Sequence, residues 1–498
     1  MQKIIASLFI AGWLLTGCGT AMVNPATGQT ERTVMNEATE VAEGAKGHQE
    51  VLKEYGIYNN PAVQSYVNAL GQKLAAQSHR AHLQWHFTVL DSPEINAFAL
   101  PGGYVYVTRG IMAYLESEAD LAGVIGHEIG HVTARHGAQR ATRQQNAGLG
   151  VFAASLLGAV LESQGVQGAG QLAGQVSQTV AAGYIASYGR DQELQADGLG
   201  AEYLARTHYA PRNMVDVINV LKNQERFAAD QAQAQGRAAP ARADWLASHP
   251  SNDQRLDTIT QLASQYQDKA GYADEGRARY LKVVQGLHFG ESADQGLVRG
   301  QNFYHAGLGF ALTAPAGWTI QNGADQLGVL NAARDATLVL RVVPPSAGKD
   351  AATIIRNVIK PTQGRTEAVA LNGLSATRFV GVRQNAQGQS QPVEATIVNG
   401  PGTTLYLMQV AGKDAAALQR ARPALRDLEM SFRALTAQDR SAARPWVLKT
   451  VAFPKGGFAE LAKSSQLDNA EKQLRLINGF YAGGEPKPGQ IVKVVDAL

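Results

Sequence analysis

Hydrophobic positions in the first 290 residues recur mainly with the period of an α-helix, whereas the chain after residue 300 is β-rich. In residues 61–77, for example, Val63, Val67, Leu70 and Leu74 fall on one side of a helix. Helices are predicted over 61–77, 117–136, 253–266 and 276–287. Strands are predicted over 84–90, 96–100 and 104–108. The sequence therefore predicts a mainly α-helical domain with a small β-sheet over residues 47–295.

The helix predicted over 117–136 has recognisable ends. Ser117 suits the N-cap position, and Asp120 suits the supporting position of a capping box. The apolar residues that follow recur at helical spacing: Leu121, Ala122, Val124, Ile125, Ile129 and Val132. Gly137 suits a helix stop. A motif in the middle of this helix is consequently expected to lie on a rigid element.

The middle of that helix carries the sequence His127-Glu128-Ile129-Gly130-His131. Histidines four residues apart lie about one turn apart on one helix face, so both imidazoles can reach one metal ion. Glu128 projects to the side, where its carboxylate can accept a proton from water at the metal. The alternative is an ordinary buried helix, but burying these polar groups unpaired is costly. The motif indicates the active site of a zinc peptidase.

A catalytic zinc ion needs a third protein ligand and an open position for water. The three-histidine form of the motif requires a histidine at position 137, which is Gly137, so that form is excluded. Glu193 and Asp197 are four residues apart and share a helix face. We expect Glu193 to bind the metal and Asp197 to orient a ligating imidazole. The alternative for this pair is a solvated acidic helix face, and Glu162 is a weaker ligand candidate because nothing around it supports ligation.

The two motifs together resemble the HtpX-like, CAAX-prenyl-protease-type zinc metallopeptidases of peptidase family M48. The segment 96–103 resembles the family's active-site edge strand and turn, and 248–251 with Arg255 resembles its downstream His-Pro motif. The resemblance covers about residues 30–290 and is closest to the lipid-anchored bacterial members. It implies one zinc ion per chain, held by His127, His131 and Glu193. It also implies that Glu128 is the general base and that Asp197 contacts and orients a ligating imidazole.

Four further residues carry expectations that accompany this resemblance. Asn96 and Ala97 are expected to bind the substrate backbone, since a strand beside the zinc helix can hold an extended peptide. A purely structural hairpin is the alternative. His249 is expected near the metal, either stabilising the oxyanion of the transition state or filling the open coordination position, which would silence the enzyme. A plain structural role is the alternative for His249. Arg255 is expected to pair with a carboxylate.

The amino terminus predicts an exported lipoprotein. A positive start and a short apolar core form a signal peptide over residues 1–17, too short for a confident membrane span. Leu15-Thr16-Gly17-Cys18 resembles a lipobox, which makes Cys18 the acylated first residue of the mature chain. An ordinary signal peptide is the alternative. Residues 18–46 are then a lipid anchor and polar tether, and an outer-membrane position facing the periplasm is expected for a Gram-negative source.

Charge and apolar run length exclude two classes of function. The net charge of +3 is too small to indicate a nucleic-acid binder. No uninterrupted apolar run reaches the 18 residues of a membrane-spanning helix. The Gly/Ala/Gln-rich insertion over 147–187 is expected to form weakly amphipathic helices that act as a lid, with a membrane-dipping hairpin as the alternative. A flexible loop is predicted over 228–243.

The second half of the chain predicts two further domains. Residues 300–436 alternate β-rich runs with helical stretches, which predicts an α+β accessory domain that binds substrates or partners or is purely structural. Residues 445–498 resemble a small βααβ LysM-type module of the kind that contacts peptidoglycan. Its first-turn signature is degenerate, because Gly456-Gly457 stands where the family has Gly-Asp.

The sequence therefore predicts a zinc metalloendopeptidase of the bacterial envelope that acts on extended or misfolded envelope proteins in quality control. A non-catalytic or self-inhibited chaperone or scaffold with the same fold is the alternative. A third hypothesis is a peptidoglycan-binding adaptor.

Overall fold

The computed structural model describes residues 20–143, 188–234, 249, 253–266, 272, 274–292, 295–323, 326–384 and 388–497. The predicted signal peptide, Cys18 and the 147–187 insertion lie outside the described residues. The chain divides into two units. Met1–Leu287 and Val447–Asp496 make up the first, and His288–Trp446 with Ala497–Leu498 make up the second.

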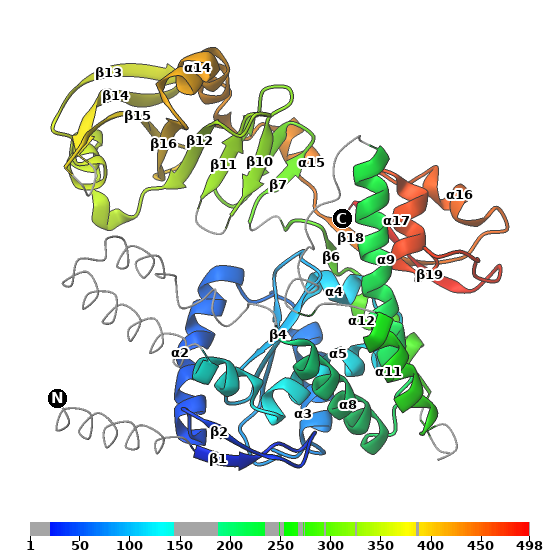
Figure 1. The fold of residues 1–498 in the computed structure, drawn as a ribbon. Helices are drawn as coiled ribbons and strands as arrows, with labels where there is room; N and C mark the ends of the chain where they lie inside the picture. Colours follow the sequence, from blue (N-terminus) through cyan, green and yellow to red (C-terminus); the bar gives the residue numbers. More distant parts are fainter. Residues whose placement is uncertain are drawn as a thin grey trace, which may run out of the picture. The chain divides into compact units, whose positions relative to one another are not determined.

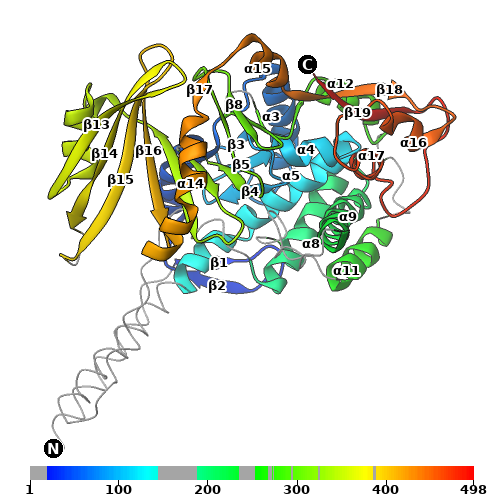
Figure 2. The ribbon, with the colours of Figure 1, turned by 90° about the horizontal axis from the view of Figure 1, so that it is seen from above.

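A three-stranded sheet forms one layer of the first unit, in the order β3 (His86–Leu90), β5 (Tyr104–Thr108), β4 (Ala97–Leu100). β3 and β5 run parallel, and β4 and β5 form an antiparallel hairpin. The hairpin turn contains Gly102, whose φ of 82° lies in the left-handed region that favours glycine. β4 is thus an edge strand, as the sequence predicts, and it packs on α5, as Figure 2 shows.

Helices make up most of the rest of this unit (Figure 1). Between residues 37 and 284 they include α2 (Glu37–Tyr55), α3 (Pro61–Ala75), α4 (Arg109–Tyr114), α5 (Glu118–Thr133), α8 (Arg190–Arg206), α9 (Asn213–Ala234), α11 (Asp253–Ser264) and α12 (Arg277–Val284). α3 follows the predicted span closely, with Asn60 as N-cap and Pro61 in the first turn. α5 contacts α3, α8 and α9, so it is the central helix of the unit.

Glycines allow α5 and α8 to cross at short range. A Cβ added to Gly130 would lie 2.9 Å from the Ala196 carbonyl oxygen of α8. A Cβ added to Gly200 of α8 would lie 3.0 Å from the backbone nitrogen of His127. Larger residues at either position would therefore push the two helices apart. Gly130 of the His127–His131 motif thus permits the short distance between α5 and α8.

The helix predicted over 117–136 ends about one turn earlier than expected. α5 ends at Thr133, and Arg135 adopts a left-handed conformation with φ of 56°. The Arg135 side chain is held there because its Nε donates to Glu40 Oε1 at 2.7 Å. Gly137 lies in the next helical stretch, where a Cβ would come 2.9 Å from Pro101 Cγ. Gly137 thus permits close packing and does not stop the helix.

The structure differs from the polar tether predicted over 18–46. Residues 20–46 contain the hairpin of β1 (Thr20–Val23) and β2 (Thr30–Thr33) and the first half of α2. Glu40 of α2 is buried and accepts from both Arg80 and Arg135. The polar composition that suggested a tether instead supplies buried, paired charges, which hydrophobic periodicity does not detect.

The carboxy-terminal residues contain β18 (Trp446–Ala452), α16 (Gly457–Ala462), α17 (Ala470–Ile477) and β19 (Ile491–Ala497), in the predicted βααβ order. Residues 447–496 belong to the same compact unit as the peptidase residues. Buried Lys493 donates to the carbonyls of Ala113 and Leu115 and pairs with Glu116. Tyr481 donates a hydrogen bond to Asp230 of α9. The helix α9 extends to Ala234, so the first part of the loop predicted over 228–243 is helical instead.

The second unit contains two antiparallel sheets, one ordered β10-β11-β12-β16-β15-β14-β13 and the other β17-β9-β8-β7. α14 (Ala415–Met430) packs on one face of the larger sheet, as Figures 1 and 2 show, and α13 (Ala351–Ile354) with the π-turn η3 (Ile355–Ile359) packs on its other face. The remaining elements are β6 (His288–Phe289), β7 (Leu297–Arg299), β8 (Asn302–His305), β9 (Phe310–Thr313), β10 (Thr319–Asn322), β11 (Leu327–Leu330), β12 (Ala336–Val342), η2 (Pro345–Ala347), β13 (Gln363–Leu371), β14 (Leu374–Gln384), β15 (Ser390–Asn399), β16 (Leu405–Gly412), β17 (Arg433–Ala434) and α15 (Ala437–Ala442).

The start of α5 is held by hydrogen bonds of the Ser117 hydroxyl and the Asp120 carboxyl group. The Ser117 side chain accepts from the Asp120 backbone N–H, as expected for an N-cap. Asp120 Oδ1 accepts from Asn213 of α9 at 2.8 Å, and Oδ2 accepts from the Glu116 backbone N–H at 3.0 Å. Burial raises the pKa of Asp120 to about 7. The folded protein therefore keeps a proton on this side chain at pH values where the unfolded chain has released it.

We predict that Asp120 makes the stability of the apoprotein fall as pH rises from about 4 to 7, because the folded state binds more protons than the unfolded state in this window. Between pH 5 and pH 8, the free energy of unfolding of the wild type should drop by on the order of 2–3 kcal/mol more than that of Asp120→Asn. Urea unfolding with chelator present measures this difference. Asp191→Asn, at an exposed position, is the matched control, and an Asp120→Asn difference that is independent of pH would contradict the prediction.

Candidate metal centre

α5 presents His127 and His131 one turn apart, and both side chains are buried. Their Nε2 atoms lie 3.0 Å apart, and their rings meet edge to face at 79°. Two Nε2 atoms at this separation cannot both carry protons without repulsion, so they are placed to share a cation. The spacing predicted from the sequence thus produces a converging pair of imidazoles.

α8 brings Glu193 against this pair. Glu193 Oε2 lies 3.6 Å from His127 Nε2, and Oε1 lies 3.5 Å from His131 Nε2. Glu193 is fully buried, and the glycine crossing of α5 and α8 is what allows a side chain from the first turn of α8 to reach the two histidines. The structure therefore brings together the three residues expected as ligands.

His249 is the fourth member of the cluster. Its Nδ1 lies 3.2 Å from His127 Nε2 and 3.1 Å from Glu193 Oε1, and the residue is buried. Ligand atoms of His127, His131, Glu193 and His249 all lie within 4.8 Å of one another. Zinc–nitrogen distances of about 2.0–2.1 Å in a tetrahedral site imply ligand–ligand distances of about 3.3 Å. The residues present therefore fit a zinc ion with four protein donors.

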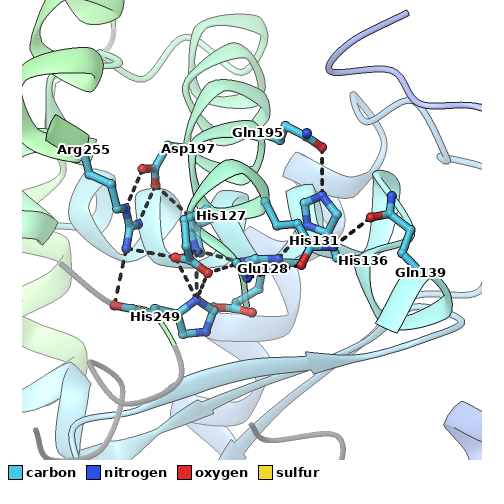
Figure 3. Close-up of polar contacts among 12 residues, drawn as sticks. His127, Glu128, His131, His136, Gln139, Gln195, Asp197, His249 and Arg255 are labelled. Atoms are coloured by element: carbon cyan, nitrogen blue, oxygen red, sulfur yellow. Dashed lines mark hydrogen bonds and ion pairs between the residues drawn. The ribbon is translucent and has the colours of Figure 1, made fainter. Parts of the chain in front are cut away.

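Asp197 and Arg255 support the cluster from behind, as Figure 3 shows. Asp197 Oδ1 lies 2.9 Å from His127 Nδ1, the ring nitrogen that faces away from the other donors. Arg255 binds Asp197 through Nε and Nη2, both at 2.8 Å, and its Nη1 lies 2.9 Å from Glu193 Oε2. Such an arrangement fixes the tautomer and orientation of the ligating imidazole. The arginine thus pairs with carboxylates, which agrees with the expectation from the sequence.

The pKa shifts of these groups follow from burial and from the charged partners packed around them. Burial alone lowers the pKa of His127, but hydrogen bonds with Asp197 and Glu193 outweigh it and raise the pKa to about 9. Burial and the neighbouring His127 charge hold the pKa of His131 well below its usual value. Burial opposes ionisation of Glu193, but the charges and hydrogen bonds of His249 and His127 hold its pKa well below 4.5. A bound cation would replace the proton on His127.

Glu128 lies beside the cluster and outside its four ligands. It is fully buried, and its Oε1 is 3.6 Å from His249 Nε2. His249 thus presents one ring nitrogen to the ligand cluster and the other toward Glu128. This position matches the lateral projection that the HEIGH spacing predicts for Glu128.

Two residues near His131 were not assigned a role from the sequence. His136 Nδ1 lies 2.8 Å from His131 Nδ1, and burial lowers the pKa of His136 to about 4. Tyr188 stacks on the His131 ring with centroids 3.9 Å apart. His136 follows His131 by five residues, a spacing that leaves the ligand face of a continuous helix. The left-handed turn at Arg135 returns it to the site, and no sequence signal marks that turn.

Asn96 and Ala97 lie on or next to the edge strand and are both buried. The backbone carbonyl of Asn96 accepts from Thr108 of β5, and its Oδ1 is buried with no hydrogen-bond partner among the residues described. Their predicted contact with substrate stays a prediction.

A family model and several curated relatives match the part of the chain that contains this site. Residues 61–263 match the model of peptidase family M48. The chain contains an M48 peptidase domain. Peptidases of this family use zinc, and the buried cluster lies within the matched residues. The resemblance predicted from the HEIGH and Glu193 motifs is thereby confirmed for the peptidase domain, whereas the LysM-like assignment stays a prediction.

Curated relatives share this domain. The chain is 28% identical over 276 residues to the beta-barrel assembly-enhancing protease of Yersinia pestis, covering 53% of each chain. It is 30% identical over 212 residues to the protein of that name from Escherichia coli, covering 42% of this chain and 40% of the relative. It is 30% identical over 234 residues to the mitochondrial metalloendopeptidase OMA1 of Schizosaccharomyces pombe, covering 46% of this chain and 62% of the relative. The aligned regions thus span about half the length of these relatives.

Within the part of the chain that the structure describes, no helix combines the length and the hydropathy needed to span a bilayer.

We predict that Asp197→Asn lowers the affinity for zinc about 10- to 100-fold, because the amide cannot hold His127 Nδ1 and both Arg255 donors at once. Competition with a chromogenic chelator at neutral pH measures the affinity. Asp191→Asn, an exposed substitution on the same helix, should leave it unchanged. Equal affinities for Asp197→Asn and the wild type would show that Asp197 does not orient the ligand.

Proposed function

We propose that the protein is a zinc-dependent metalloendopeptidase of the bacterial cell envelope. The observation that carries this proposal is the convergence of His127, His131 and Glu193 with the carboxylate of Glu128 beside them. The names of the relatives, which are proteases and metalloendopeptidases, support the same class of activity. Extended or misfolded envelope proteins are the proposed substrates. Lipid attachment at Cys18, outer-membrane placement and peptidoglycan contact through 445–498 remain predictions from the sequence.

When bound, zinc supplies Lewis acidity, which lowers the pKa of a water ligand and polarises a carbonyl group. Glu128 is the proposed general base: its carboxylate accepts the proton of the attacking water and passes it to the nitrogen of the leaving amine when the carbon–nitrogen bond breaks. The edge strand β4 packs on α5 and can hold an extended peptide by main-chain hydrogen bonds. Asn96 and Ala97 are the proposed contact residues at that strand.

His249 is the proposed gate of the active site. A catalytic zinc site keeps one position open, whereas four protein ligands close it. His249 Nδ1 occupies the fourth donor position of the cluster, so in this conformation the site has the closed form. We therefore favour a self-inhibited peptidase, in which His249 must leave before substrate enters. In the scaffold hypothesis, His249 stays permanently at the fourth donor position.

We predict that Glu128→Gln abolishes casein cleavage and keeps one zinc per chain, because the amide cannot act as a base and is not a ligand. His249→Ala should keep zinc and cleave casein faster than the wild type, because it opens the fourth position. Zinc content and cleavage are measured on the form that begins after Cys18. Arg190→Ala, at an exposed position in α8, is the control for substitution near the site.

The outcomes separate the hypotheses. Zinc binding with no cleavage by any of the proteins, His249→Ala included, would favour the scaffold. Cleavage that persists in Glu128→Gln would exclude Glu128 as the base. Slower cleavage by His249→Ala than by the wild type would mean that His249 assists the reaction, as in the oxyanion hypothesis.

A further inference from the structure

A chain of hydrogen bonds runs from the proposed zinc ligand His131 to the amino-terminal hairpin. His131 Nδ1 lies 2.8 Å from His136 Nδ1, and His136 Nε2 lies 3.0 Å from Gln195 Oε1. The Asn24 side chain donates to the same Gln195 oxygen at 3.0 Å. Figure 3 shows Gln195 and His136 on the His131 side of the cluster, away from Asp197 and Arg255. His127 is thus contacted through its Nδ1 by Asp197, and His131 through its Nδ1 by His136.

The proton positions along this chain follow from the ligand role of His131. If His131 Nε2 binds the metal, its proton is on Nδ1, and that N–H needs an acceptor. The His136 atom that lies 2.8 Å from His131 Nδ1 is Nδ1, so this nitrogen must be the acceptor and carry no proton. The proton of a neutral His136 is then on Nε2. His136 Nε2–H then donates to Gln195 Oε1. One consistent set of donors and acceptors results.

Gln195 must present its oxygen to His136, and Asn24 determines that orientation. A side-chain amide can rotate to present either oxygen or nitrogen. The Asn24 amide donates to Gln195 Oε1, so a rotated Gln195 would bring two donor groups together. Asn24 is itself completely buried, its Oδ1 accepts from the Ala26 backbone N–H, and its amide also donates to Glu31. The hairpin turn therefore fixes Asn24 rigidly.

We propose that the amino-terminal hairpin (20–33) is part of the metal centre, and that Asn24, Gln195 and His136 are positioning residues that hold His131 in its ligating orientation. This proposal rests on the metal centre described above and extends it to a segment about 100 residues before the HEIGH motif. The hairpin lies directly after the predicted acylation site at Cys18. Zinc affinity should therefore depend on the segment that leads from the predicted lipid anchor.

The experiment measures zinc affinity by chelator competition in the full mature chain. His136→Phe keeps a ring but removes the acceptor, and should lower zinc affinity about 10- to 100-fold. His136→Asn places an oxygen near the position of Nδ1, and should bind zinc more tightly than His136→Phe. Asn24→Ser keeps an oxygen for the hairpin turn but cannot reach Gln195, and should lower affinity about 2- to 10-fold. Thr27→Ala, an exposed change in the same turn, is the matched control.

A double-mutant cycle decides whether the residues act as one chain. In the His136→Phe background, Asn24→Ser should cause no further loss of affinity. Equal losses in both backgrounds, or no loss in the wild-type background, would overturn the proposal. The visible spectrum of the cobalt-substituted protein is the second measurement, because it reports ligand geometry and should change in His136→Phe and not in Thr27→Ala.

The stability of the apoproteins separates positioning from a purely structural role. Unaltered thermal unfolding of metal-free His136→Phe, together with weaker zinc binding, supports positioning. Lower apoprotein stability with unchanged zinc affinity would overturn it. A wild-type chain that binds no zinc would instead refute the metal centre itself, so failure of the proposed function is distinguishable from failure of this inference.

Discussion

The short crossing of α5 and α8 is the constraint on which the metal centre depends. Three of the four proposed ligands come from two helices separated by more than 50 residues of chain. Glu193 reaches His127 and His131 only because Gly130 and Gly200 leave no side chain between the helix backbones. Helix axes usually stay 8–10 Å apart because side chains fill the contact. The glycines thus convert two separate sequence motifs into one cluster of donors.

Burial of charge is the second determinant of the site. Glu193 and Asp197 are ionised groups without contact to solvent, and such groups persist only when they are paired and hydrogen-bonded. Arg255 pairs with both, which leaves a geometry that favours a cation among His127, His131 and Glu193. The same arrangement places His249 as a fourth possible donor, so one set of contacts underlies both the proposed metal affinity and the proposed closure of the site.

Local patterns predict the candidate ligands His127, His131 and Glu193 because these residues lie on regular helices. The spacing of His127 and His131, and of Glu193 and Asp197, translates directly into shared helix faces, and the strands of the sheet were found from their β-rich runs. The supporting residues were missed where structure departs from periodicity. His136 reaches the site through a left-handed turn at Arg135, and the hairpin that carries Asn24 has too little apolar character to predict.

Long-range packing was equally hidden from the sequence. Lysine is rarely buried, so nothing in the sequence indicated that Lys493 would be enclosed against the α4–α5 connection. The predicted boundary at 445 reflects a real change in pattern, yet residues 447–496 and the peptidase residues form one compact unit. Sequence patterns identify elements and their faces, whereas contacts between distant segments depend on side-chain shape and charge in the folded protein.

X-ray absorption at the zinc edge of the purified full chain tests the central claim most directly, because it reports the identity and number of the ligands. The account predicts one zinc per chain with three imidazole ligands and one carboxylate oxygen, at about 2.0–2.2 Å. Absence of zinc, or a site with fewer than three imidazoles, would contradict the assignment of His127, His131, Glu193 and His249 as one metal centre.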